Sequence, residues 1–99
     1  MQREQQDVPI DVKCRSAPDG WTCTVSVGGD ADGSQHEVEV TRDELELLVP
    51  GATDATPLVE ASFRYLLERE PRESILPRFS IRTIASYFPS YPEEIRARL

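Results

Sequence analysis

The order of apolar and polar residues divides the chain into a first part with a period of two and a second part with a helical period. In the first part, apolar residues alternate with polar ones over 8–14, 21–27 and 36–40. This alternation is typical of strands that bury one face. The sequence therefore predicts three consecutive strands in an antiparallel meander.

Turn signals between these runs indicate how the strands pair. Residues 17–20, Ala-Pro-Asp-Gly, place proline and glycine at favoured turn positions. A four-residue loop there pairs Cys14 with Cys23 and keeps the apolar residues of both strands on one face. A three-residue loop with a glycine bulge would instead put Trp21 opposite Ala17 and split the faces. We therefore expect the four-residue loop, and a common apolar face for the second and third strands as well.

From residue 41 onward, apolar residues recur at helical spacing. Thr41 and Glu44 form a capping-box pair that starts a short helix. The next helix is expected from Thr56 to about Arg69, before a proline that disfavours further helix. Its apolar and small residues cover roughly two-thirds of the circumference, more than a helix lying on a sheet needs. We therefore expect a central helix, covered on a second side by the C-terminal segment or by another subunit.

The last third of the chain carries short helical patterns separated by prolines. One or two turns are expected over 71–77, with Ile75 and Leu76 pointing inward. Ser80 is the expected N-cap of the following helix, and a capping-box pair starting at Ser90 opens the last one. The fold class expected is α+β: a three-stranded antiparallel β-meander, a central apolar helix and several short C-terminal helices.

Length and charge limit the possible functions. Residues 1–7 are expected to be a disordered tail and 8–99 a single α+β domain. No apolar run approaches the roughly 20 residues needed to span a bilayer, and the polar start does not resemble a signal peptide. We therefore expect a cytoplasmic protein without membrane contact. The net charge of −7 disfavours nucleic acid as a partner.

Cys14 and Cys23 face each other in the predicted hairpin. As a pair they could form a disulfide, act as a redox switch or supply half of a metal site. The chain has no Cys-x-x-Cys spacing and no recognisable secretion signal. Free thiols in the core are therefore the expected state.

Two further candidate sites are better explained by structural roles. The segment GGDADGS contains a fragment of calcium-loop chemistry, but a full loop opening at Asp30 needs a bidentate glutamate where Thr41 stands. A plain hairpin loop is expected instead. His36 alternates with valines and lacks a recognisable nucleophile or orienting partner, so we expect a structural residue at the margin of the sheet. No catalytic, cofactor-binding or metal-binding residue is predicted, and we do not expect an enzyme.

Residues 80–99 match a bacterial helix-turn-helix in the spacing of their apolar positions. Arg82, Arg96 and Arg98 could meet phosphates. However, Pro89 stands at the turn position that usually holds glycine and cannot adopt a left-handed conformation. The second helix also begins with glutamates, where the DNA groove is most negative. A DNA-binding regulator is therefore the alternative hypothesis.

Residues 62–91 resemble a family of small bacterial proteins with the motif SFxxLLEREPxxSIL…YFPxY. Its distinctive stretches are LLEREPRESIL at 66–76 and Tyr-Phe-Pro at 87–89. The resemblance covers under a third of the chain and implies no activity, ligand or site residue. Within this motif, Arg69 or Arg72 is expected to donate hydrogen bonds to carbonyls left free where the helix stops.

The leading hypothesis is a non-enzymatic protein-interaction or regulatory module, acting as a homodimer or with a protein partner. It rests on the surplus apolar surface of the central helix and on the missing catalytic constellation. The partner-binding residues are not predicted, but any aromatic residue of the C-terminal half that is left exposed would mark a contact surface. A pocket for a small molecule between sheet and helices is a third hypothesis without sequence support.

Overall fold

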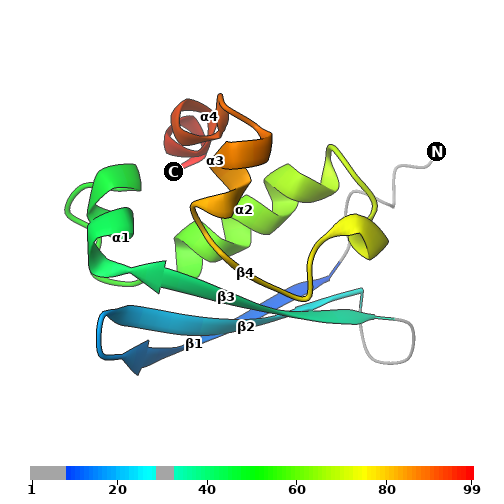
Figure 1. Cartoon of the computed structure of the whole chain (residues 1–99), viewed down its shortest axis with the longest axis horizontal. Helices are drawn as coiled ribbons and strands as arrows, with labels where there is room; N and C mark the ends of the chain where they lie inside the picture. The colour runs from blue at the N-terminus through cyan, green and yellow to red at the C-terminus, as the bar shows by residue number, and fades with distance from the viewer. Residues whose placement is uncertain (1–8, 29–32) are drawn as a thin grey trace.

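The computed structural model describes residues 9–28 and 33–99, which form a sheet with helices on one face (Figure 1). The elements are β1 (Ile10–Ala17), β2 (Gly20–Val27), β3 (Ser34–Thr41), α1 (Arg42–Leu48), α2 (Thr56–Leu67), the 3-10 turn η2 (Arg72–Ser74), β4 (Arg78–Ser80), α3 (Thr83–Tyr87) and α4 (Tyr91–Arg98). The strands lie in the order β1-β2-β3-β4. The fold class is α+β, as predicted. The tail predicted over 1–7 lies outside the described residues.

The meander has the predicted register. Cys14 lies opposite Cys23 on β1 and β2, and Trp21 lies opposite Val40 on β2 and β3. This pairing places the apolar residues of all three strands on one face, which the helices cover in Figure 1. The opposite face carries threonines and charged residues and remains exposed or half-buried.

The first turn is tighter than expected, because the strands extend until Ala17 pairs with Gly20. Only Pro18 and Asp19 remain outside the ladder. A Cβ atom on Gly20 would lie 2.1 Å from the carbonyl oxygen of Val40. Glycine is therefore required there by the close approach of β3.

The sheet has a fourth strand, so the prediction of three antiparallel strands was incomplete. β4 runs parallel to β3, and its flanking residues complete the pairing. The Glu37 amide donates to the Pro77 carbonyl at 2.8 Å, and the Ile81 amide donates to the Glu39 carbonyl at 2.9 Å. Three residues after a proline show too little alternation to be recognised in the sequence. β4 also contains Ser80, which is therefore not a helix N-cap.

α2 is the central helix, as predicted, and it ends two residues earlier than expected. Its buried residues are Leu58, Val59, Ser62, Phe63, Tyr65 and Leu66. The sheet lies on one side of this helix, and Tyr91 of α4 contacts its Tyr65 and Ser62 from the other. The second cover is therefore the C-terminal segment of the same chain.

The two predicted capping boxes have different outcomes. At α1, the Glu44 amide donates to Thr41 Oγ1 at 3.1 Å and the Thr41 amide donates to Glu44 Oε1 at 2.9 Å, which confirms the first box. At α4, the Ser90 hydroxyl donates to Glu94 Oε2 at 2.9 Å and caps no amide. The second box was wrong because the N-cap serine takes the carboxylate one residue further along.

Residues 71–77 form a single 3-10 turn followed by extended chain. Ile75 is buried, as predicted, but Leu76 is 45% exposed, so its inward orientation was wrong. Extended backbone sends consecutive side chains to opposite sides, and only one of the two can face the core. Within residues 9–28 and 33–99, no helix has the length and apolar character to cross a membrane.

Candidate functional site

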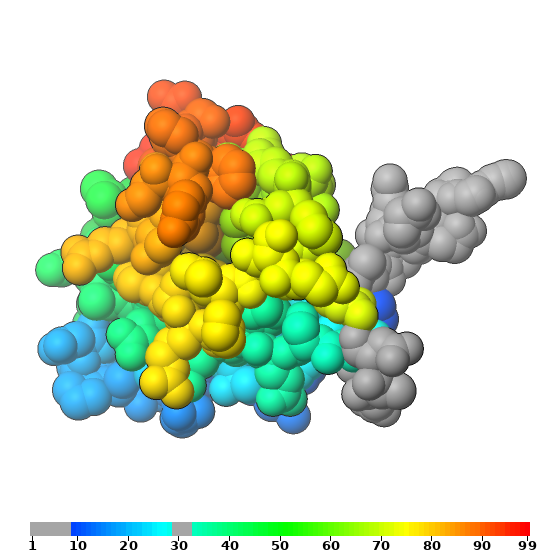
Figure 2. All heavy atoms as spheres, turned by 45° about the vertical axis from the view of Figure 1, so that its right-hand side comes forward, coloured from blue at the N-terminus to red at the C-terminus, as the bar shows by residue number. Residues whose placement is uncertain are grey.

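An apolar groove lies where the end of α2, the chain after η2, β4 and α3 meet. It has a volume of about 440 Å³. Its lining residues are Leu66, Glu70, Ser74, Ile75, Leu76, Phe79, Thr83, Ile84, Tyr87 and Phe88. The segments that border it, yellow and orange in Figure 2, lie on the face turned toward the viewer. Its size falls within the roughly 300–1,000 Å³ typical of ligand pockets.

Prolines and a buried histidine give this groove its shape. Pro71 has extended backbone and turns the chain away from the end of α2. Further along, the ring of His36 accepts or donates at both nitrogens: Nδ1 lies 2.8 Å from the Leu76 carbonyl oxygen, and Nε2 lies 2.8 Å from Ser34 Oγ. A carbonyl only accepts, so Nδ1 carries a proton. His36 therefore fixes the backbone of Leu76 in the groove wall.

Leu76 and Tyr87 are exposed apolar residues on the rim of the groove. Leu76 is 45% exposed and Tyr87 is 67% exposed. The backbone at Leu76 is fixed by His36, so its side chain is presented outward by the fold. Clustered exposed apolar side chains beside a groove mark contact surfaces more often than isolated ones do. Tyr87 is thus an exposed aromatic residue of the C-terminal half, which the sequence analysis expected to mark a contact surface.

A network of arginines fastens α4 to the C-terminal end of α2, beside the groove. Arg69 Nη1 donates to the Tyr65 carbonyl at 3.1 Å, which confirms that this arginine caps the end of α2. Arg69 Nη2 donates to Glu94 Oε1 at 2.7 Å, and the guanidinium carbon lies 3.7 Å from the centre of the Tyr65 ring. Arg98 donates to Glu68 at 2.5 Å, and this bond lowers the pKa of the Glu68 carboxyl.

A buried pair of hydroxyls joins the same two helices. The Ser62 hydroxyl donates to the Leu58 carbonyl at 2.7 Å, so the Tyr91 hydroxyl, 2.6 Å away, donates to Ser62 Oγ. Burial raises the pKa of Tyr91 to about 12. This pair of hydroxyls fixes the position of α4 on α2.

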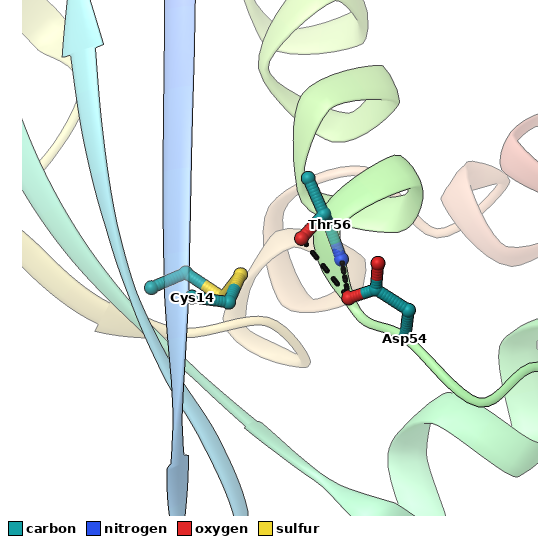
Figure 3. Close-up of a disulfide and its surroundings, with 4 residues drawn as sticks. Cys14, Asp54 and Thr56 are labelled. Atoms are coloured by element: carbon teal, nitrogen blue, oxygen red, sulfur yellow. Dashed lines mark hydrogen bonds between the residues drawn. A yellow bond between two sulfur atoms is a disulfide. The ribbon is translucent and has the colours of Figure 1, made fainter.

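Cys14 and Cys23 are joined by a disulfide, so the expectation of free thiols was wrong. The register places the two residues directly opposite each other, within reach of a bond. Free thiols had been expected because the chain lacks a recognisable secretion signal. Figure 3 shows the disulfide beside the first turn of α2. There the Asp54 carboxylate accepts hydrogen bonds from the amide and the hydroxyl of Thr56, at 3.1 and 3.0 Å.

The remaining sequence candidates are not brought together into a site. His36 is only 4% exposed and has both nitrogens engaged, at the buried edge of the core beside Phe63 and not at an open margin of the sheet. Asp30 lies outside the described residues. Among the residues that the structure describes, no group of three or more His, Cys, Asp or Glu side chains is arranged to hold a metal ion.

The three arginines of the helix-turn-helix hypothesis are engaged within the chain. Arg82 lies 3.6 Å from the Glu44 carboxylate, Arg96 donates to the Leu47 carbonyl at 3.1 Å, and Arg98 bonds Glu68. α3 is also only five residues long. Each of the three arginines therefore has a partner within the chain, although all three remain exposed.

Comparison of the chain with models of known families, with curated proteins and with solved structures finds no match. The resemblance of residues 62–91 to a bacterial family therefore stays a prediction. Its two distinctive stretches do meet at one place in the fold, because residues from both of them line the groove.

Proposed function

We propose that this chain is a non-enzymatic protein-interaction module whose contact surface is the groove bordered by Leu76 and Tyr87. The observation that carries the proposal is an open apolar groove with two exposed apolar residues on its rim, one of which, Leu76, has its carbonyl bound by His36. Leaving such surface in water is unfavourable by roughly 25 cal/mol per Å². A partner that covers the groove recovers this energy.

The proposal gives a protein partner more weight than self-association. The homodimer hypothesis rested on surplus apolar surface of α2, and the C-terminal segment of the same chain covers that surface. The DNA-binding alternative is less favoured, because α3 is only five residues long and Arg82, Arg96 and Arg98 each contact another group of the chain.

The cytoplasmic placement stays an expectation from the sequence, and the Cys14–Cys23 disulfide weighs against it. Disulfides persist mainly in oxidising compartments. If Cys14 and Cys23 are oxidised in intact cells, the module works in an oxidising compartment; if they are reduced, it works in a reducing one such as the cytoplasm.

Site-specific photocrosslinking tests the groove directly. Benzoylphenylalanine replaces Tyr87 in one variant and Leu47 in a control, in cells that express the chain naturally. Both positions are about two-thirds exposed, at 67% and 68%, but only Tyr87 lines the groove. We expect a discrete adduct with another protein from position 87 and none of the same mass from position 47. Identical adducts from the two positions, or none from position 87, would contradict the proposal.

A further inference from the structure

The lining of the groove contains a single charged residue, Glu70, in the chain just after α2. The rest of the lining is apolar except for the hydroxyls of Ser74, Thr83 and Tyr87. Glu70 is half-buried, and its backbone is fixed because its amide donates to the Leu66 carbonyl at 2.9 Å. Glu70 therefore contributes a negative charge to the wall of an otherwise apolar site.

The Glu70 side chain has no ion pair or hydrogen bond within residues 9–28 and 33–99. Nearby arginines are committed elsewhere: Arg69 pairs with Glu68 and Glu94, and Arg64 pairs with Glu60. The carboxylate is thus able to accept a charge-assisted hydrogen bond from a ligand, which is stronger than a neutral one.

On this basis we propose that the groove binds a short segment of another protein that carries a large apolar side chain next to a lysine or arginine, with the cation paired to Glu70. This inference rests on the proposed function and names its class of partner. Apolar sites with a few fixed polar groups obtain orientation and specificity from those groups. The whole chain has a net charge of −7, but residues 58–99, which form the groove, sum to +1, so the preference for a cation rests on Glu70 itself.

The net charge of −7 argues against a second copy as the occupant, since two acidic chains repel each other. The other strongly exposed apolar residues of the described chain are Leu47 and Leu99. They belong to α1 and the end of α4, outside the groove lining.

Selection from a displayed library of random peptides tests this preference. The full chain is immobilised, and the enriched peptides are synthesised and titrated against wild type, Glu70→Gln, Tyr87→Ala and the control Glu73→Gln. Glu73 is exposed and does not line the groove. We expect enriched peptides with a large apolar residue near Lys or Arg. Their affinity should fall at least tenfold with Glu70→Gln, fall with Tyr87→Ala and stay unchanged with Glu73→Gln.

A charge reversal sharpens the test. Replacing the basic residue of a selected peptide by glutamate should weaken binding to wild type, and Glu70→Lys should restore it. Groove-dependent peptides without a basic preference would overturn the inference and leave the interaction function standing. Failure to enrich any peptide sensitive to Tyr87→Ala would overturn both. A dimer in light scattering that Tyr87→Ala dissociates would identify a second copy as the occupant and would also overturn the inference.

Discussion

The meander and the C-terminal segment are held in place by different kinds of contact. β1, β2 and β3 pair through continuous backbone ladders of eight residues each. The segment from η2 to α4 pairs with the sheet through the three residues of β4, and side-chain contacts hold the rest, including Tyr91 to Ser62 and Arg98 to Glu68. A ladder tolerates many sequences that keep the alternation, whereas each side-chain contact needs one residue type at one position. Substitutions should therefore affect the two regions differently.

The largest expected effect is on the aromatic cluster that joins α2 to the C-terminal segment. Tyr65 is 1% exposed and packs edge-on against Phe88 and Tyr91. Tyr65→Ala should lower the free energy of unfolding by about 3–5 kcal/mol, the usual cost of deleting a buried aromatic ring. Urea denaturation measures this. Tyr87→Ala is the matched control and should change stability by less than about 0.5 kcal/mol, because that ring is exposed. Equal losses would mean that Tyr87 is part of the core.

An intermediate effect is expected in the meander. The disulfide closes a loop with a sequence separation of 9, so reducing it should cost about 2–3 kcal/mol. Urea denaturation with and without a dithiol reductant measures the difference, after mass spectrometry has confirmed the thiols. The double variant Cys14→Ala, Cys23→Ala should be insensitive to the reductant. A wild-type midpoint that reduction leaves unchanged would show that the backbone ladder alone holds this hairpin.

The smallest effect at neutral pH concerns the hydroxyl pair. Tyr91→Phe removes one buried hydrogen bond to Ser62 and should cost about 1 kcal/mol. The wild-type chain should also lose stability between pH 10 and 12, because the folded pKa of Tyr91 is raised to about 12 and the unfolded tyrosine releases its proton earlier. Its contribution is fully present below pH 10. Urea denaturation at pH 8 and pH 11 should therefore show the gap between wild type and Tyr91→Phe narrowing, and a constant gap would contradict the assignment.

The difference between the two regions also explains what the sequence could predict. Alternation and turn chemistry were enough for the register of β1, β2 and β3, because a slip of one residue would expose every inward side chain. The capping box at Thr41 and the wide apolar surface of α2 were also predictable, because each depends on residues that are close together in the sequence. β4 and the position of Leu76 were missed because both depend on β3, about forty residues earlier in the chain: residues 37–39 pair with β4, and His36 contacts the Leu76 carbonyl. Local patterns carry no information on such a contact.

Only the residue types of the candidate groove could be predicted from the sequence, not their arrangement. The aromatic richness of the C-terminal half was visible in the sequence, and so was the rule that an exposed member would mark a surface. Which aromatic residue stays outside was not visible, because α3 ends after only five residues and leaves Tyr87 exposed while Phe88 is half-buried. The disulfide was recognised as one of several states and was rejected on compartment grounds.

The parallel pairing of β4 with β3 has a consequence for biosynthesis. A nascent chain that has emerged only as far as residue 70 has its meander and α2, but the edge of β3 still lacks the strand that covers it. Open strand edges invite pairing with other chains. Residues 71–99 therefore cover this edge and complete the groove together, because β4 takes part in both.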